Sequence, residues 1–183
     1  MFSLSKPLYV SAQAGQRNIA DLLEAHVANY YVDQGGTLPE TVRTIEDVSI
    51  GDRLIDIKTR DINREFSMPN LISVDRLRKS KDKNIQYHFI DYKIVDRALD
   101  QTGSNEVEVT GQSIVDVWDI DWTVLKIQNL GKGQLQLCGV KDYNIIPRWV
   151  HGKDKWFERL ETEMKAFYTK QIKKFEGYIE DLK

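Results

Sequence analysis

The chain has 183 residues, of which 41% are hydrophobic and 30% are charged, and its formal net charge is -2. This length suits one domain, which can bury a core without disulfide or metal staples. The sequence contains no low-complexity tract and no solenoid-type repeat. The slightly negative charge does not by itself indicate a nucleic-acid binder, because contact with phosphates needs lysine and arginine.

The cysteine content and the hydropathy indicate the compartment. Cys138 is the single cysteine, so no disulfide can form within the chain, which fits a reducing environment. No apolar run approaches the ~20 residues that span a bilayer. Residues 1–10 lack the basic and apolar regions of a signal peptide. We therefore expect a cytoplasmic protein without a membrane segment.

The first half of the chain predicts a helix, a β-hairpin and a second helix. Residues 17–32 carry apolar side chains at helical spacing. Residues 42–50 and 53–58 are rich in β-branched and apolar residues, and Gly51-Asp52 between them indicates a tight turn. Residues 61–69 are polar and irregular. Pro69 can begin a helix, which we expect over residues 70–79.

The second half predicts several strands and one long helix. We expect strands at residues 85–95, 106–110, 113–122 and 134–140, and an amphipathic helix at 153–182. Gly111 separates two of the strands, and Gly177 is a weak point in the helix. Gly131-Lys132-Gly133 lacks the remainder of a P-loop, so no nucleotide cofactor is expected. The order of elements predicts a single mixed α/β domain over residues 1–183.

Basic residues cluster locally despite the overall charge. Residues 58–83 contain eight lysines and arginines against four acidic residues. Arg60 and Arg64 lie in this stretch and are candidates for contact with DNA phosphates. The cluster makes the net charge of the whole chain a weak argument against nucleic-acid binding.

The most informative stretch spans residues 46–58. Side chains alternate between the two faces of a strand, so Asp56 and Lys58 share one face, about 7 Å apart. The isoleucines that flank Asp56 share the other face and are expected to pack against a helix. If the chain reverses at the Gly51-Asp52 turn, Asp47 comes opposite this region. Two carboxylates and one lysine then converge.

This grouping suits phosphodiester hydrolysis. Carboxylate oxygens bind Mg²⁺, which keeps open positions for water and phosphate. The metal polarises the phosphoryl group, and a lysine can stabilise the developing charge or orient the water. Two other interpretations stay open from spacing alone. Asp56 and Lys58 can form an ion pair on a solvated strand face, or the pattern can arise by chance.

The residues Leu54–Asn63, followed by Met68–Ser73, resemble the active-site region of the HincII-like type II restriction endonucleases, of the PD-(D/E)XK superfamily. In that family the run D-V-K-T-R-N-I-S is followed at the same spacing by A-P-N-I-I-S. Residues 89–94 resemble its next strand, and residues 152–156 with the helix after them resemble its C-terminal helix. The match is specific over the active-site region and weaker but collinear over most of the chain.

The resemblance implies a restriction-endonuclease-like fold, in which helices flank a mixed β-sheet and the chain ends in a long helix. It also implies a Mg²⁺-dependent endonuclease that cuts double-stranded DNA as a homodimer. The catalytic and metal-binding positions that it implies are Asp47, Asp56, Lys58 and Glu24, with the backbone carbonyl of Ile57 as a further metal ligand. The DNA-contacting positions that it implies are Asn70, Phe66 and Ser67.

The sequence departs from the family in three ways. The chain is shorter than HincII, Glu46 stands where a proline usually precedes the first aspartate, and the interval from Asp47 to Asp56 is short for the class. Ser67 also replaces a glutamine that inserts between bases in HincII. These departures keep two alternatives open, which are a structure-selective or nicking nuclease and a catalytically silent DNA-binding module.

Overall fold

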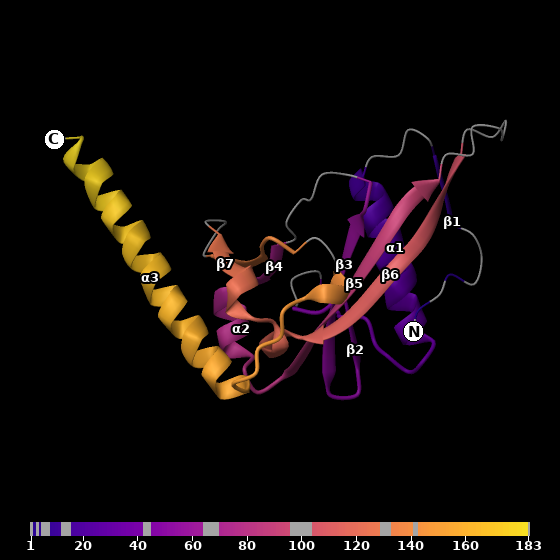
Figure 1. The fold of residues 1–183 in the computed structure, drawn as a ribbon, viewed down its shortest axis with the longest axis horizontal. Coiled ribbons are helices and arrows are strands. Elements are labelled where there is room, and N and C mark those ends of the chain that lie inside the picture. Colours follow the sequence, from indigo (N-terminus) through magenta and orange to yellow (C-terminus); the bar gives the residue numbers. More distant parts are fainter. Residues whose placement is uncertain are drawn as a thin grey trace. The chain divides into compact units, whose positions relative to one another are not determined.

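The computed structural model describes residues 2, 4, 8–11, 16–41, 45–63, 70–95, 104–128, 133–140 and 143–182 (Figure 1). These residues form two compact units. The first unit takes in residues 1–67, 83–117 and 140–146, and the second takes in residues 68–82, 118–139 and 147–183. The expectation of one nuclease domain over residues 1–183 stays a prediction.

A five-stranded mixed sheet forms the centre of the first unit. Its strands are β1 (Leu8–Ser11), β2 (Val48–Ile50), β3 (Arg53–Asp61), β5 (Asn84–Val95) and β6 (Ser104–Asp116). The strand order is β1-β6-β5-β3-β2. β3 and β5 run parallel to each other, and the other neighbouring pairs are antiparallel. Two central strands that run side by side in parallel need a long connection between them, which here includes part of the second unit.

The predicted hairpin of β2 and β3 forms, but its first strand covers only Val48–Ile50 of the expected residues 42–50, of which 42–44 lie outside the described residues. Ile50 pairs with Arg53, so the turn consists of Gly51 and Asp52 alone. Gly51 has a φ of 60°, the left-handed value that a type II′ hairpin turn requires at its first central position. Asp47 therefore comes immediately before β2, beside the middle of β3.

Helix α1 (Gln16–Val32) covers one face of this sheet, in agreement with the predicted helix over residues 17–32. Ile55 and Ile57 of β3 point into this interface, so Asp56 and Lys58 lie on the opposite face. The core that α1 shares with the sheet consists of Phe2, Leu8, Val10, Ile19, Leu23, Val27, Ala28, Tyr31, Val48, Ile55, Ile57, Ile90, Tyr92 and Val107.

The prediction of two strands separated at Gly111 was wrong. β6 continues through Gly111, and its register against β5 shifts between Asp91 and Tyr92. Asp91 pairs with Gly111 and Tyr92 pairs with Val109, so one residue bulges out without ending the ladder. The strand ends at Asp116, and the 3-10 helix η1 (Val117–Asp119) follows where a strand through residue 122 was expected.

The second unit contains a three-stranded antiparallel sheet in the order β4-β8-β7. Its strands are β4 (Asn70–Ser73), β7 (Leu125–Gln128) and β8 (Gln134–Leu137), and helix α2 (Val74–Lys79) follows β4 directly. The helix predicted over residues 70–79 is therefore only half correct. Asn70 and Ser73 pair with β8, and this pairing overrides the helical spacing of the apolar residues.

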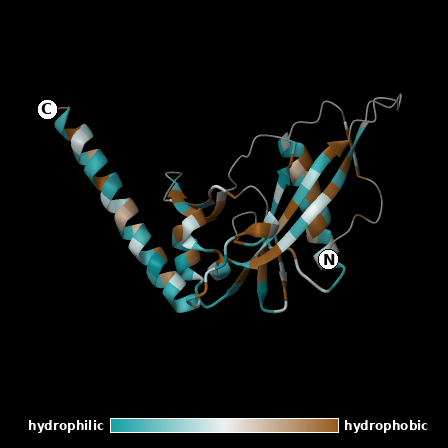
Figure 2. Ribbon diagram, viewed as in Figure 1, coloured by the Kyte–Doolittle hydropathy of each residue, from teal (hydrophilic) through white to brown (hydrophobic). Residues whose placement is uncertain are grey.

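Helix α3 (Lys153–Glu180) confirms the predicted C-terminal helix, and Gly177 does not interrupt it. Its first half is anchored by Trp156, Phe157, Leu160 and Met164, all buried, and the Trp156 indole donates to the carbonyl of Ile120 at 2.8 Å. Its second half is mainly hydrophilic with scattered apolar residues (Figure 2). Two short 3-10 helices, η2 (Trp122–Val124) and η3 (Tyr143–Ile145), complete the secondary structure.

Strands β1 and β7 were not predicted from the sequence. No helix in the described part of the chain is long and apolar enough to cross a membrane.

Candidate active site

The hairpin places Asp47 against the backbone of β3. The amide of Asp47 donates to the carbonyl of Ile55 at 2.9 Å. In return, the carboxylate oxygen Oδ2 of Asp47 accepts the amide of Ile57 at 2.6 Å. This charge-assisted hydrogen bond fixes the side chain beside the segment that carries Asp56 and Lys58.

Asp56 and Lys58 form a largely buried ion pair on the face of β3 that points away from α1. The ammonium of Lys58 donates to Oδ1 of Asp56 and, at 3.2 Å, to the backbone carbonyl oxygen of Ile57. The exposed fraction of the side chain is 8% for Asp56 and 22% for Lys58. The predicted convergence of these two residues is present.

Glu24 reaches the same region from α1. The hydroxyl of Thr59 donates to Oε1 of Glu24 at 3.3 Å. Glu24 also interacts electrostatically with Lys58 and with Asp47. Lys58 therefore pairs directly with Asp56 and also interacts electrostatically with Asp47 and Glu24.

The electrostatics of the cluster reflect burial and this excess of negative charge. Burial raises the pKa of Glu24 to about 7; the Lys58 charge opposes the rise and Asp47 adds to it. Burial likewise raises the pKa of Asp56 to about 7, again opposed by Lys58 and increased by Asp47. Burial lowers the pKa of Lys58, but the surrounding carboxylates outweigh it and hold that pKa above its usual value. Two carboxyl groups that titrate near neutral pH are typical of catalytic sites.

The oxygen atoms of the cluster suit a hard divalent cation. Among the described residues, no group of three or more His, Cys, Asp and Glu side chains is placed to hold a metal ion. The donor set that the resemblance implies is different in kind, because it combines Asp47 and Asp56 with the backbone carbonyl of Ile57. Asp56 and the Ile57 carbonyl already converge on one cation, the Lys58 ammonium, which shows that their oxygens can share a positive ion.

Comparison with known proteins identifies the type of fold. No protein-family model matches the chain, and no curated protein sequence matches it. Among solved structures, the chain is similar to the NlaIV restriction endonuclease, with a TM-score of 0.52 and 12% sequence identity, over 92% of this chain and 80% of that one. The chain has a restriction-endonuclease-like fold. At this identity the likeness shows the fold alone, so the finer resemblance to HincII stays a prediction.

Within this fold, the predicted DNA contacts are placed only in part. Phe66, Ser67 and Arg64 lie outside the described residues. Asn70 begins β4, and only its backbone is described, paired with Gln136 of β8. The DNA-binding role of these four residues stays a prediction.

Arg60 has a structural partner that the sequence did not indicate. Its guanidinium donates from Nε and Nη2 to the two carboxylate oxygens of Asp91, at 2.7 and 2.8 Å. The guanidinium also lies 4.3 Å from the ring centroid of Tyr143. Asp91 is the only acidic residue of β5 and lies between the apolar residues Ile90 and Tyr92, and this pattern was the signal in the sequence that it needed a buried cation.

Tyr87 is another residue that the sequence reasoning missed. It is the register partner of Asp56 on the parallel strand β5, so the two side chains lie on the same face of the sheet. The residue is fully buried, and its hydroxyl has no hydrogen-bond partner among the described residues. Burial, with the Asp56 charge added, raises the pKa of the phenol well above its usual value.

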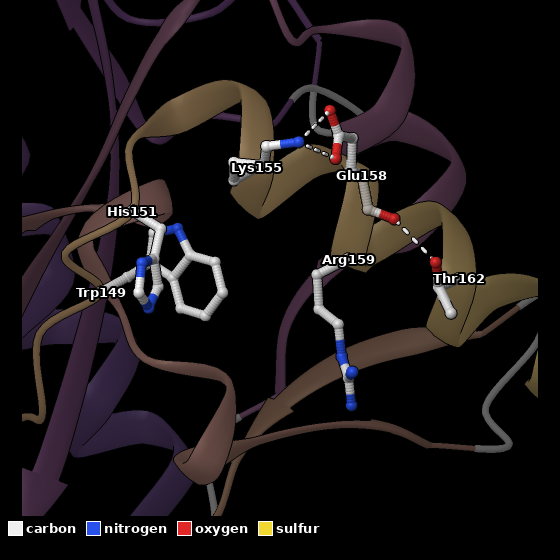
Figure 3. A pocket seen from close by; sticks show the side chains of 6 residues that line it. All are labelled: Trp149, His151, Lys155, Glu158, Arg159 and Thr162. Carbon is white, nitrogen blue, oxygen red and sulfur yellow. Dashed lines mark hydrogen bonds and ion pairs between the residues drawn. The ribbon is translucent and has the colours of Figure 1, made fainter.

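The second unit carries an open groove of about 510 Å³ along the start of α3 (Figure 3). Trp149 and His151 stand at one end of it, with their rings 4.8 Å apart. Its cationic residues already have carboxylate partners, because Lys155 pairs with Glu158 and Arg159 pairs with Glu163. The groove therefore presents no concentrated charge, in contrast to the carboxylate cluster of the first unit.

Proposed function

We propose that the chain is a Mg²⁺-dependent DNA endonuclease of the PD-(D/E)XK class, which hydrolyses phosphodiester bonds in double-stranded DNA at specific sites, as type II restriction enzymes do. The observation that carries this proposal is the cluster of Glu24, Asp47 and Asp56 around Lys58 in a restriction-endonuclease-like fold. An ion pair on a solvated strand face would not need three carboxylates for one lysine, nor would it be buried.

The residues divide the chemistry among them. Asp47, Asp56 and the carbonyl oxygen of Ile57 would hold the metal. The chemistry that bound Mg²⁺ supplies is polarisation of the scissile phosphoryl group and easier ionisation of water. Lys58 stabilises the negative charge that develops on the phosphate oxygens. Glu24, with a pKa of about 7, can accept a proton from the attacking water near neutral pH.

The substrate implies a second copy of the chain. Two cuts in a symmetric duplex site need two active sites, and a homodimer whose two-fold axis matches that of the DNA supplies them. Asn70, Phe66, Ser67 and Arg64 are the positions proposed to contact the DNA. Arg60, the other position expected from the sequence, is instead held by Asp91.

The first test compares wild-type protein with the Lys58→Ala variant on supercoiled plasmid and on long linear DNA, with Mg²⁺ and with EDTA. We expect discrete fragments from the wild type with Mg²⁺ alone, and a rate lower by at least about 10²-fold in the variant. Lys93→Ala is a matched control, because Lys93 forms an exposed ion pair with Glu108 on the same sheet.

The pattern of cleavage separates the alternatives. Nicking alone, or preference for branched DNA, would keep the nuclease and remove site-specific cutting of duplexes. Binding to DNA without cleavage in Mg²⁺ would indicate a silent binding module. Equal cleavage by wild type and Lys58→Ala would remove this site from the mechanism.

A further inference from the structure

The ammonium of Lys58 contacts two of the oxygen atoms that are proposed to bind the metal. It donates to Oδ1 of Asp56 and to the carbonyl oxygen of Ile57 at 3.2 Å. Both oxygens belong to the proposed metal donor set. An oxygen that accepts from a buried ammonium has turned a lone pair toward that group, so a metal can take the same lone pair only after the ammonium moves.

The surroundings of Lys58 hold the ammonium firmly. The charged groups that act on it are Asp56, Asp47 and Glu24, and all three are carboxylates. The carboxylate of Asp56 is only 8% exposed. Withdrawing the ammonium without a replacement would leave buried carboxylates uncompensated, which is a strongly unfavourable state. A metal cation or a proton must therefore arrive as the ammonium leaves.

Lysine is suited to such an exchange. Its ammonium is a compact charge at the end of a flexible four-carbon stem, whereas the planar guanidinium of arginine is directional. Lys58 is also the more open partner, with 22% of its side chain exposed, so it has room to turn toward the solvent side of the cluster. That side is the direction from which a phosphate would approach.

We propose that Lys58 is the resident cation of the donor set, and that a divalent metal binds by displacing its ammonium from Asp56 and from the Ile57 carbonyl. This inference rests on the proposed metal site. The exchange keeps the carboxylates neutralised throughout, and it releases the ammonium for the scissile phosphate only when the metal is in place. Metal binding would therefore free the Lys58 ammonium to contact the phosphate, in addition to making the water easier to ionise.

Competition of this kind raises the apparent Kd of the metal. The apparent Kd equals the intrinsic Kd divided by the fraction of molecules in which the ammonium has left the oxygens. Isothermal titration with MgCl₂ and with MnCl₂, without DNA, measures it in wild type, Lys58→Met and the control Lys93→Met. We expect a Kd about tenfold lower or more in Lys58→Met than in wild type, although the variant cleaves poorly, and an unchanged Kd in Lys93→Met. An equal or higher Kd in folded Lys58→Met would overturn the proposal.

A second measurement uses the wild type, so it does not depend on how the variant folds. It also separates displacement of the ammonium from simple charge repulsion between Lys58 and the metal, which would likewise lower the Kd in Lys58→Met. The ¹H–¹⁵N signal of the Lys58 ammonium is followed while Mg²⁺ is added. We expect the signal of the bonded ammonium to disappear in step with metal binding. A signal unchanged at metal saturation would show that the ammonium stays on Asp56, and the proposal would be wrong while the metal site stands. If neither protein binds a metal, the proposed metal site fails, and this inference fails with it.

Discussion

Two buried ion pairs lie on the same face of β3, two residues apart, and their surroundings differ. Lys58 pairs with Asp56 within the strand, and Arg60 pairs with Asp91 on the neighbouring strand β5. Both carboxylates are well buried, with 8% of the Asp56 side chain and 7% of the Asp91 side chain exposed. The two cations therefore lie on the same face of the same strand, and their carboxylate partners are equally buried. The pairs differ in how many carboxylates act on each cation.

Arg60 matches the geometry of one carboxylate with two parallel hydrogen bonds, and the ring of Tyr143 covers its guanidinium. Lys58 pairs with Asp56 alone, but the charges of two further carboxylates, Asp47 and Glu24, also act on it. A matched pair is electrically complete and has little to offer a ligand, whereas a cluster with surplus negative charge attracts a cation. Proximity of acid and base is common to both; the surplus of carboxylates distinguishes the candidate active site.

The largest expected effect on stability comes from breaking the matched pair. Arg60→Ala leaves the Asp91 carboxylate buried without its partner, which should lower the free energy of unfolding by about 3–5 kcal/mol. Urea unfolding measures this change. Lys93→Ala, which breaks the exposed pair with Glu108, should cost less than about 1 kcal/mol. If both variants lose equally little, the Arg60–Asp91 pair is not the structural element described here.

The surplus charge should make the metal-free protein sensitive to pH. The pKa values of Glu24 and Asp56 rise to about 7 in the folded chain from ordinary values of 4.5 and 3.8. The folded state therefore keeps protons that the unfolded chain releases. The stability that these groups contribute is fully present below about pH 4 and is lost as pH rises through about 7.

His88 acts in the opposite sense, because burial lowers its pKa, but it is neutral in both states well above pH 6.5. The informative quantity is therefore the difference between wild type and Glu24→Gln over pH 6.5 to 8, because both proteins keep His88. There we expect the urea midpoint of the metal-free wild type to fall, and Glu24→Gln to fall less. Mg²⁺ should restore the midpoint at pH 8. Parallel curves for wild type and Glu24→Gln would contradict the raised pKa of Glu24.

A smaller change tests how the carboxylates influence one another. Asp47 raises the pKa of both Glu24 and Asp56, so Asp47→Asn should bring both pKa values below about 7. The asparagine can still accept the amide of Ile57 through its side-chain carbonyl, so the hairpin should keep its structure. Carbon-13 NMR of the two carboxyl groups measures the shift. Unchanged pKa values would show that Asp47 is electrostatically separate from the cluster.

The smallest expected effect concerns the hydroxyl beside Asp56. The buried Tyr87 hydroxyl has no partner among the described residues, so Tyr87→Phe should raise the free energy of unfolding by about 1 kcal/mol. Thermal unfolding in the metal-free state measures this gain. A loss of stability instead would show that the hydroxyl makes a hydrogen bond and supports the cluster.

The candidate site could be predicted because its residues are close in the sequence. The alternation of Leu54-Ile55-Asp56-Ile57-Lys58 determines which side chains share a face, and the Gly51-Asp52 turn returns Asp47 to the same place. Helices α1 and α3 could be predicted for a similar reason, because helical spacing is a local pattern. Glu24 came from the resemblance, and the structure adds its contact with Thr59.

The elements that could not be predicted depend on partners far along the chain. Arg60 was expected to contact DNA because of the basic stretch around it, and its partner Asp91 lies 31 residues away. Their meeting depends on the parallel register of β3 and β5, which no local pattern specifies. The strand at Asn70–Ser73 is a similar case. The apolar pattern allowed either a helix or a strand there, and the pairing with β8 selects the strand.

The two-residue turn between β2 and β3 limits how this region can change in length over evolution. Asp47 and Asp56 are nine positions apart, and nearly all of that interval is paired strand or turn. One residue inserted into the hairpin would shift its register by one position, so that the isoleucines would turn away from α1 and the acidic groups would turn toward it. Homologous chains should therefore vary in length elsewhere, and keep this interval or change it by an even number of residues.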